Sequence, residues 1–124
     1  MAKSTDLMTL GMGGAALAQL VGISPGAITA AGTTDGASTA IPANITWANV
    51  TTASSQTGVK LPAGSSSNPV SLYVPYYVSA TGGQTCVVYP PSGTTIDATT
   101  SANVSNNTTA VFWKTSSTTW VRST

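Results

Sequence analysis

The sequence predicts an all-β protein, built as a small antiparallel sandwich or barrel with an N-terminal arm or short helix. Short stretches rich in β-branched and aromatic residues recur along most of the chain, and clusters of Gly, Pro, Ser and Asn separate them. Only one stretch, at the N-terminus, has helical spacing. The length of 124 residues is enough for one hydrophobic core. We therefore expect an arm or short helix over residues 1–26 and a β domain over 27–124, extended and loop-rich over 27–64 and an antiparallel β module over 65–124.

The N-terminal stretch STDLMTLGMGGAALAQLVGISPG repeats apolar residues at steps of three and four, which places them on one helix face. Asp6 suits the start of a helix, and Pro25 with Gly26 would end it. Three glycines inside the stretch each cost the helix up to about 1 kcal/mol relative to Ala. The helix is therefore stable only if something packs on it. We favour an arm that binds a partner, with these candidate contact residues: Leu7, Met8, Leu10, Leu17, Leu20 and Val21.

Three alternatives remain for the same stretch. It is also compatible with an ordinary core helix, with a signal peptide cleaved near Ala30, or with a membrane span. Asp6, Thr9 and Gln19 interrupt the apolar run, which disfavours the last two. We expect no membrane partner.

Residues 27–64 consist of small residues, β-branched residues and turn formers. AITAAG, TAIPANITWANVTT and GVKLPAG are typical of short strands or extended segments, and Asp35 with Gly36 indicates a tight turn. Pro42 and Pro62 cannot donate to a ladder, so we expect their segments to lie outside central sheet positions.

Residues 65–124 predict regular β-structure. In PVSLYVPYYVSA, the alternation of Val70, Leu72 and Val74 with polar residues predicts one half-buried strand. TGGQ turns the chain, TCVVY returns it, PPSG turns it again, and TTI, the polar loop DATTSANVSNN, and the strands TTAVFWK and TTWVRS follow. The close spacing favours antiparallel pairing, because parallel strands are expected to need crossover helices.

The composition excludes several function classes. Charged residues make up only 6%, the net charge is +1, and no basic cluster is present, so nucleic-acid binding is not expected. The chain has no His and no Glu, which removes the usual catalytic triads, acid/base pairs and His metal sites. We predict no enzymatic activity, no catalytic or metal-binding residues and no cofactor.

Three other polar or reactive residues have ordinary structural explanations. Cys86 is the single cysteine, which predicts a small buried side chain within a strand. Asp35 and Asp97 are expected to make local backbone hydrogen bonds in turns.

The aromatic residues allow two interpretations. We favour packing of Trp113 and Trp120 in the core, with Tyr73, Tyr76 and Tyr77 as possible subunit contacts. Alternatively, the chain's tyrosines and tryptophans form an exposed platform on which sugars stack.

The module SLYVPYYVSA…CVVYPPSGTTID…TTAVFWKT…TTWV resembles a β-rich module of tailed-bacteriophage virion proteins, notably capsid decoration (cement) proteins. The strand ending in Tyr-Pro, the Gly-bearing turn with Ile, the Ala-Val-Phe strand and the terminal Thr-Trp hairpin occur in the order typical of such modules. The resemblance covers about residues 61–122 and brings no matched functional residues. The long N-terminal half departs from the module.

The resemblance implies a protein on the outer surface of a virion capsid that binds the major capsid protein and stabilises the shell. It also implies a homo-oligomer, with a trimer favoured, and makes residues 2–26 a candidate docking arm. A carbohydrate-binding or host-recognition appendage of the virion is the alternative, and a secreted surface or pilus subunit is the third.

Overall fold

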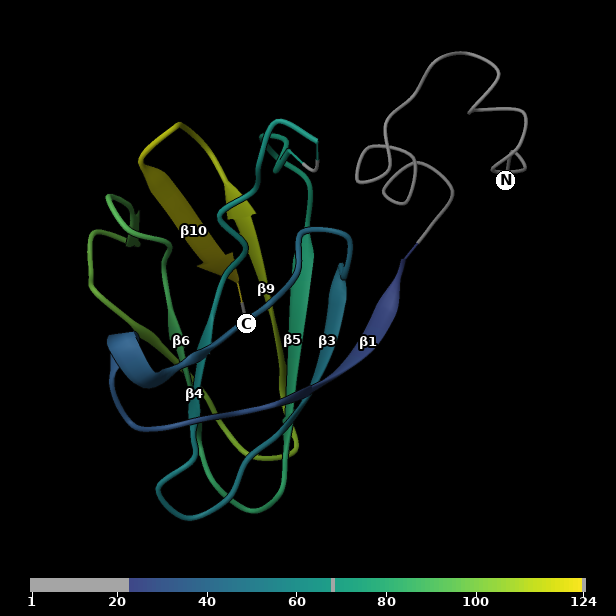
Figure 1. Cartoon of the computed structure of the whole chain (residues 1–124), viewed down its shortest axis with the longest axis vertical. Coiled ribbons are helices and arrows are strands. Elements are labelled where there is room, and N and C mark those ends of the chain that lie inside the picture. Colours follow the sequence, from purple (N-terminus) through teal and green to yellow (C-terminus); the bar gives the residue numbers. More distant parts are fainter. Residues whose placement is uncertain (1–22, 68, 124) are drawn as a thin grey trace.

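A computed structural model describes residues 23–67 and 69–123 (Figure 1). It contains one 3-10 turn, η1 (Asp35–Ala37), and these strands: β1 (Pro25–Thr29), β2 (Thr39–Ala40), β3 (Trp47–Thr51), β4 (Gly58–Lys60), β5 (Tyr76–Thr81), β6 (Cys86–Tyr89), β7 (Thr95–Ile96), β8 (Ala102–Val104), β9 (Thr109–Lys114) and β10 (Thr119–Ser123). The predicted all-β fold is confirmed. The expected helix or arm over residues 1–22 lies outside the described residues.

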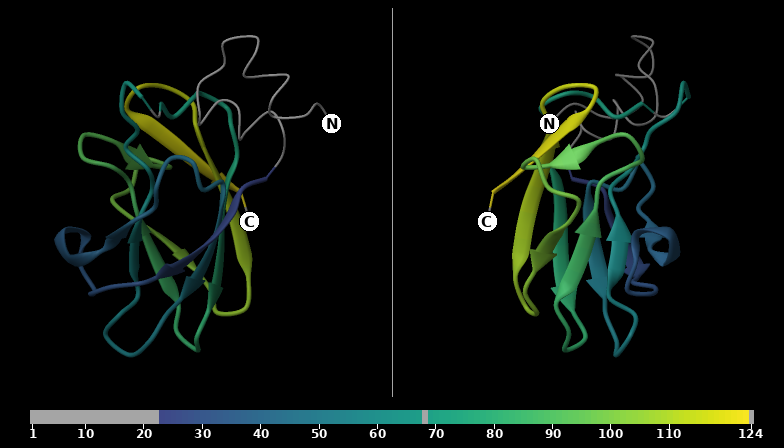
Figure 2. Two further views of the ribbon diagram at one scale, coloured as in Figure 1. Left: turned by 45° about the vertical axis from the view of Figure 1, so that its right-hand side comes forward. Right: turned by 90° about the vertical axis from the view of Figure 1, so that its left-hand side faces the viewer.

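The strands form two sheets that pack on one core (Figure 2). Sheet A has six strands in the order β1-β3-β5-β9-β10-β7, and sheet B has four in the order β2-β4-β6-β8. Alternate side chains of each strand are buried, as in β5, where Tyr76, Val78 and Ala80 are buried and the residues between them are not. The architecture is a β-sandwich.

Successive strands alternate between the two sheets from β1 to β9, and only β9 and β10 form a hairpin within one sheet. As a result β1, β3 and β5 are parallel neighbours in sheet A, and β2, β4 and β6 are parallel neighbours in sheet B. The β7–β10 pair is also parallel. The expectation of antiparallel pairing was therefore wrong for these strands. The crossover between parallel strands is a strand of the opposite sheet, so no helix is needed.

Antiparallel pairing is confirmed for three strand pairs of the C-terminal part of the chain. The predicted strands TTAVFWK and TTWVRS are β9 and β10, with Val121 opposite Trp113. The β5–β9 and β6–β8 pairs are also antiparallel.

The core between the sheets is filled by aliphatic and aromatic side chains from both layers. Trp120, Phe112 and Tyr76 are its largest fully buried members. Tyr76 and Trp120 pack edge to face with ring centroids 5.9 Å apart, a favoured aromatic geometry. The Tyr76 hydroxyl donates a 3.0 Å hydrogen bond to the Ala43 carbonyl, so its buried polar end is satisfied. Trp120 and Cys86 lie in the core as predicted, whereas Trp113 is only half-buried.

Two segments of the C-terminal half differ from the predicted pattern. Residues 69–75 are a loop, because β5 begins only at Tyr76. Leu72 is exposed there, and Tyr73 adopts a left-handed φ of 63° that no β-strand residue has. In addition, the predicted polar loop contains β8, whose Val104 is buried opposite Cys86.

The described part of the N-terminal half forms regular sheet rather than extended chain. Pro25 and Gly26 begin β1 instead of ending a helix, and the side chain of Ile45 lies directly over Gly26. β4 is an interior strand of sheet B, which the presence of Pro62 had led us not to expect. Pro62 lies beyond the last ladder residue of β4, so its missing N–H interrupts no pairing.

The turn after β5 is fixed on Thr52. The Thr52 amide and hydroxyl both donate to the Thr81 carbonyl at 2.8 Å, and the hydroxyl accepts from the Gln84 amide at 3.1 Å. Gly82 lies against this buried threonine with a φ of 101°, and a Cβ there would overlap the Thr52 carbonyl oxygen. Gly83 has a φ of 97° but open space around it.

We predict that Gly82→Ala lowers the free energy of unfolding by about 3 kcal/mol, because left-handed strain and steric overlap add together. Gly83→Ala is the matched control and should lose only about 1 kcal/mol, from strain alone. Urea denaturation of the two variants measures the difference. Equal losses would show that the contact with Thr52 does not constrain the turn.

Candidate interaction surface

The outer face of sheet A is formed by the alternate residues of its strands that point away from the core. β1, β3 and β5 contribute Pro25, Ala27, Thr29, Trp47, Asn49, Thr51, Tyr77, Ser79 and Thr81, and β9, β10 and β7 contribute Thr109, Val111, Trp113, Thr119, Val121, Ser123 and Thr95. We call this set the outer face. It contains no charged residue.

An apolar row crosses the outer face at one level of the sheet. Pro25 pairs with Trp47, Trp47 with Tyr77, and Tyr77 with Val111. The rings of Trp47 and Tyr77 stack with centroids 4.8 Å apart and planes 18° apart. Such cross-strand aromatic pairs stabilise a sheet and fix the orientation of both rings. Trp113 and Val121 form a second apolar pair farther along β9 and β10.

The next level of the outer face is polar but neutral. Asn49 pairs with Ser79, and Ser79 pairs with Thr109. The Thr109 hydroxyl donates to the Ser79 hydroxyl at 3.1 Å. The face therefore presents aromatic rings beside short hydroxyl and amide side chains.

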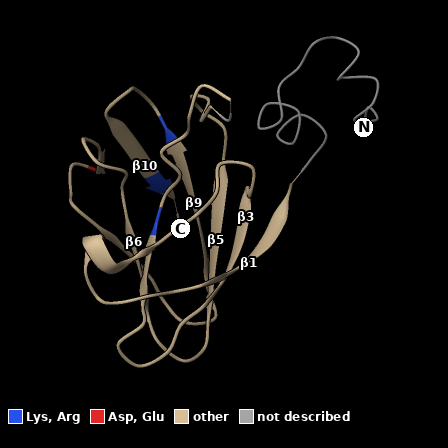
Figure 3. Cartoon of the chain, viewed as in Figure 1, with Lys and Arg blue, Asp and Glu red and all other residues tan. Residues whose placement is uncertain are grey.

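The charged residues that the structure describes lie on β4, β9 and β10 and outside the strands (Figure 3), and none is among the outward residues of sheet A. Lys114 and Arg122 alternate with the outward residues of β9 and β10. Their side chains are therefore attached on the inner side of sheet A, near the ends of these strands. Arg122 donates from Nη1 to the Asn103 carbonyl of sheet B at 2.5 Å.

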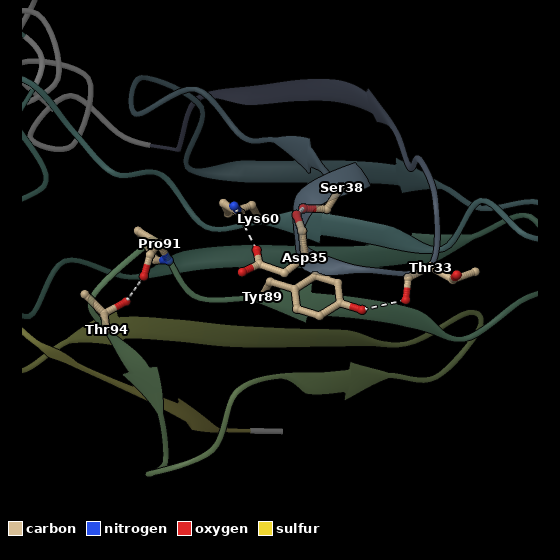
Figure 4. A network of polar contacts seen from close by, with 7 residues as sticks. All are labelled: Thr33, Asp35, Ser38, Lys60, Tyr89, Pro91 and Thr94. Carbon is tan, nitrogen blue, oxygen red and sulfur yellow. Dashed lines mark hydrogen bonds and ion pairs between the residues drawn. The ribbon is translucent and has the colours of Figure 1, made fainter.

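Sheet B carries a different outer surface, because residues 33–38 run across it (Figure 4). The Lys60 ammonium forms an ion pair with the Asp35 carboxylate at 2.8 Å. The Tyr89 hydroxyl donates to the Thr33 carbonyl at 2.9 Å, and Ser38 bonds the Asp35 carbonyl through its hydroxyl at 2.7 Å. These contacts fix residues 33–38 over the outer side of β4 and β6, so this part of the sheet B surface is covered by the chain itself.

Each of the two aspartates in the described part of the chain makes a contact distant in sequence, and neither carboxylate makes the local turn hydrogen bond that the sequence predicted. Asp35 joins η1 to β4 through Lys60, and Asp97 accepts the Arg122 amide of β10 at 3.4 Å. Asp97 and Arg122 also line an open hollow of about 500 Å³ with Thr99, Ser101, Ala102 and Asn103.

The structure separates the tyrosines that the sequence grouped as possible subunit contacts. Tyr77 lies on the outer face, and Tyr73 is 69% exposed on the 69–75 loop. Tyr76 is buried in the core, so its assignment as a subunit contact was wrong. The predicted contact residues of the arm, from Leu7 to Val21, lie outside the described residues.

Sequence reasoning missed Trp47 as the neighbour of Tyr77. The two residues are far apart in the chain and meet only because β3 and β5 pair in parallel. An alternation of Trp47, Asn49 and Thr51 with buried residues was the available signal.

The described residues contain no group of three or more His, Cys, Asp or Glu that could hold a metal ion. Over the same ranges, no helix has the length and hydrophobicity to cross a membrane. Comparison with family models, with curated proteins and with solved structures gives no match.

Cys86 is a core residue of β6, and burial raises the pKa of its thiol to about 12. A raised folded-state pKa leaves stability unchanged below the unfolded pKa, near 9.0, and removes stability as the pH rises toward 12.

We predict that the wild-type protein loses about 2 kcal/mol more stability than Cys86→Ala does between pH 8 and about pH 10.5. Cys86→Ala starts from a lower value because it leaves a cavity, but it lacks the titrating thiol. Denaturation curves across the pH range give both slopes. Parallel slopes would contradict the burial of a neutral thiol.

Proposed function

We propose that this protein is a capsid decoration protein of a tailed bacteriophage. It binds the major capsid protein at the outer surface of the virion through the outer face of sheet A and stabilises the shell. The observation that carries the proposal is the outer face itself, which is uncharged, neutral-polar and aromatic, and uncovered by other described segments.

Interface composition supports this choice of face. Protein–protein interfaces are depleted of charged residues at their centre and enriched in aromatic residues. Trp47, Tyr77 and Trp113 occupy such a centre, and short hydroxyl side chains surround them. The surface of sheet B fits less well, because it holds the Asp35–Lys60 pair and the segment that covers it.

Self-association remains a prediction from the resemblance and is not part of this proposal. The resemblance to decoration proteins favours trimers, which match points where three capsid subunits meet. A second contact with the shell, made by the N-terminal arm, remains a prediction.

A carbohydrate-binding role has some support from the same aromatic residues. Sugar platforms need open ring faces. Trp47 and Tyr77 instead turn one face of each ring toward the other. For that reason we place the carbohydrate-binding role second.

We predict that Asn49→Asp weakens binding to capsid shells at least tenfold, about 1.4 kcal/mol, because the substitution buries an unpaired charge in the interface. Asn103→Asp is the matched control: it adds the same charge at an exposed position of β8 in sheet B and should bind normally. Co-sedimentation of each variant with undecorated shells gives the affinities. Normal binding by Asn49→Asp, with or without an effect of the control, would exclude the outer face as the contact.

We also predict that binding to shells changes less than about twofold between 0.05 and 0.5 M sodium chloride, because an uncharged face makes no ion pairs for salt to screen. The fraction of protein retained on sedimented shells measures this. Release at the higher salt concentration would indicate an electrostatic interface instead.

A further inference from the structure

β1 is the one long free sheet edge in the described part of the chain. The two sheets end on β1, β7, β2 and β8, and β1 has five residues, whereas the other three have two or three (Figure 1). Short edge strands protect a sheet against pairing with other chains, and charged residues do the same. β1, with the sequence PGAIT, is longer and uncharged, and the one protective residue it carries is Pro25 at its first position.

The hydrogen bonds to β3 define which backbone groups of β1 face outward. The Ser24 carbonyl accepts from the Trp47 amide at 3.2 Å, and the Ala30 amide donates to the Thr51 carbonyl at 3.0 Å. Since the direction alternates along a strand, the even-numbered residues from 24 to 30 bond to β3. The backbone groups of Pro25, Ala27 and Thr29 therefore point away from the sheet.

These outward groups complement a second copy of the same strand. If two β1 strands run antiparallel with Ala27 opposite Ala27, each Ala27 N–H meets the other Ala27 carbonyl. Each Thr29 N–H then meets the Pro25 carbonyl of the second copy. Pro25 has no N–H to return to Thr29, but the Thr29 carbonyl already accepts the Thr39 hydroxyl at 2.7 Å. The pairing therefore leaves no outward group of the strand without a partner.

We propose that two copies of this protein associate edge to edge through β1, in an antiparallel pair centred on Ala27. The pair joins two copies of sheet A into one continuous sheet around a two-fold axis. That axis is perpendicular to the sheet, so both outer faces point to the same side and a shell can engage them together. The contact is small, so we expect a dissociation constant of about 10–100 μM.

This two-fold pairing goes beyond the proposed function and can be tested without shells. It also competes with the trimer, because an isologous edge pair closes at two copies. A two-fold pair and a trimer have different masses, so the mass of the free protein distinguishes the two arrangements.

The test uses Ala27→Pro in the full chain. Proline removes the Ala27 N–H, which makes no bond to β3, and therefore breaks the pair without breaking the β1–β3 ladder. Ala27→Thr is the control, because it keeps the N–H and adds only a β-branched side chain on the outer face. Sedimentation velocity over about 5–500 μM should show a monomer–dimer equilibrium for the wild type and Ala27→Thr, and at least tenfold weaker association for Ala27→Pro.

A covalent readout tests the register. Hydrogen-bonded antiparallel residues have Cα atoms about 5.5 Å apart, within the range of a disulfide. Ala27→Cys should therefore form a disulfide-linked dimer on mild oxidation much faster than Asn49→Cys, an exposed position on interior strand β3. Cys86 is buried and does not compete.

Several results would overturn the proposal. A free protein that stays monomeric up to 500 μM, a trimer, or a dimer that Ala27→Pro leaves intact would each do so. The proposal would also be overturned if the wild-type protein is monomeric and Ala27→Pro weakens its binding to shells. The β1 edge would then pair with a strand of the capsid protein.

Discussion

Neither sheet of this protein can complete its hydrogen bonding without the other, because each strand from β1 to β8 is followed by a strand of the opposite sheet. Along the chain, β2 lies between β1 and β3, and β4 lies between β3 and β5, so a strand of sheet B separates each pair of parallel neighbours in this part of sheet A. Burial of Tyr76, Phe112 and Trp120 between the layers holds this arrangement together. We infer that the two sheets fold as one cooperative unit.

The interleaving also determines the two surfaces. Residues 33–38 connect β1 to β2 and cover sheet B, where Asp35 and Tyr89 fix them by an ion pair and a hydrogen bond. Sheet A has no such cover from the described residues, so its outward residues remain available. The open outer face of sheet A and the edge position of β1 are both consequences of this chain path.

The sequence was sufficient for the fold class, for the β9–β10 hairpin, for the turn at Gly82 and for the burial of Cys86, because each depends on local alternation or turn chemistry. Pairing direction was not predictable in this way. It depends on which sheet each strand joins, and two-residue strands such as β2 and β7 give almost no periodic signal. The stacking of Trp47 on Tyr77 depends on the pairing direction of β3 and β5. The centre of the outer face could therefore not be predicted from the sequence.

The central claim is that the outer face of sheet A binds a capsid surface. Electron cryo-microscopy of virions that carry this chain tests it most directly. We expect density for the protein on the outside of the shell, with Trp47 and Tyr77 toward the capsid protein and the Asp35–Lys60 pair toward solvent. Absence of the protein from the shell, or attachment through sheet B, would contradict the account.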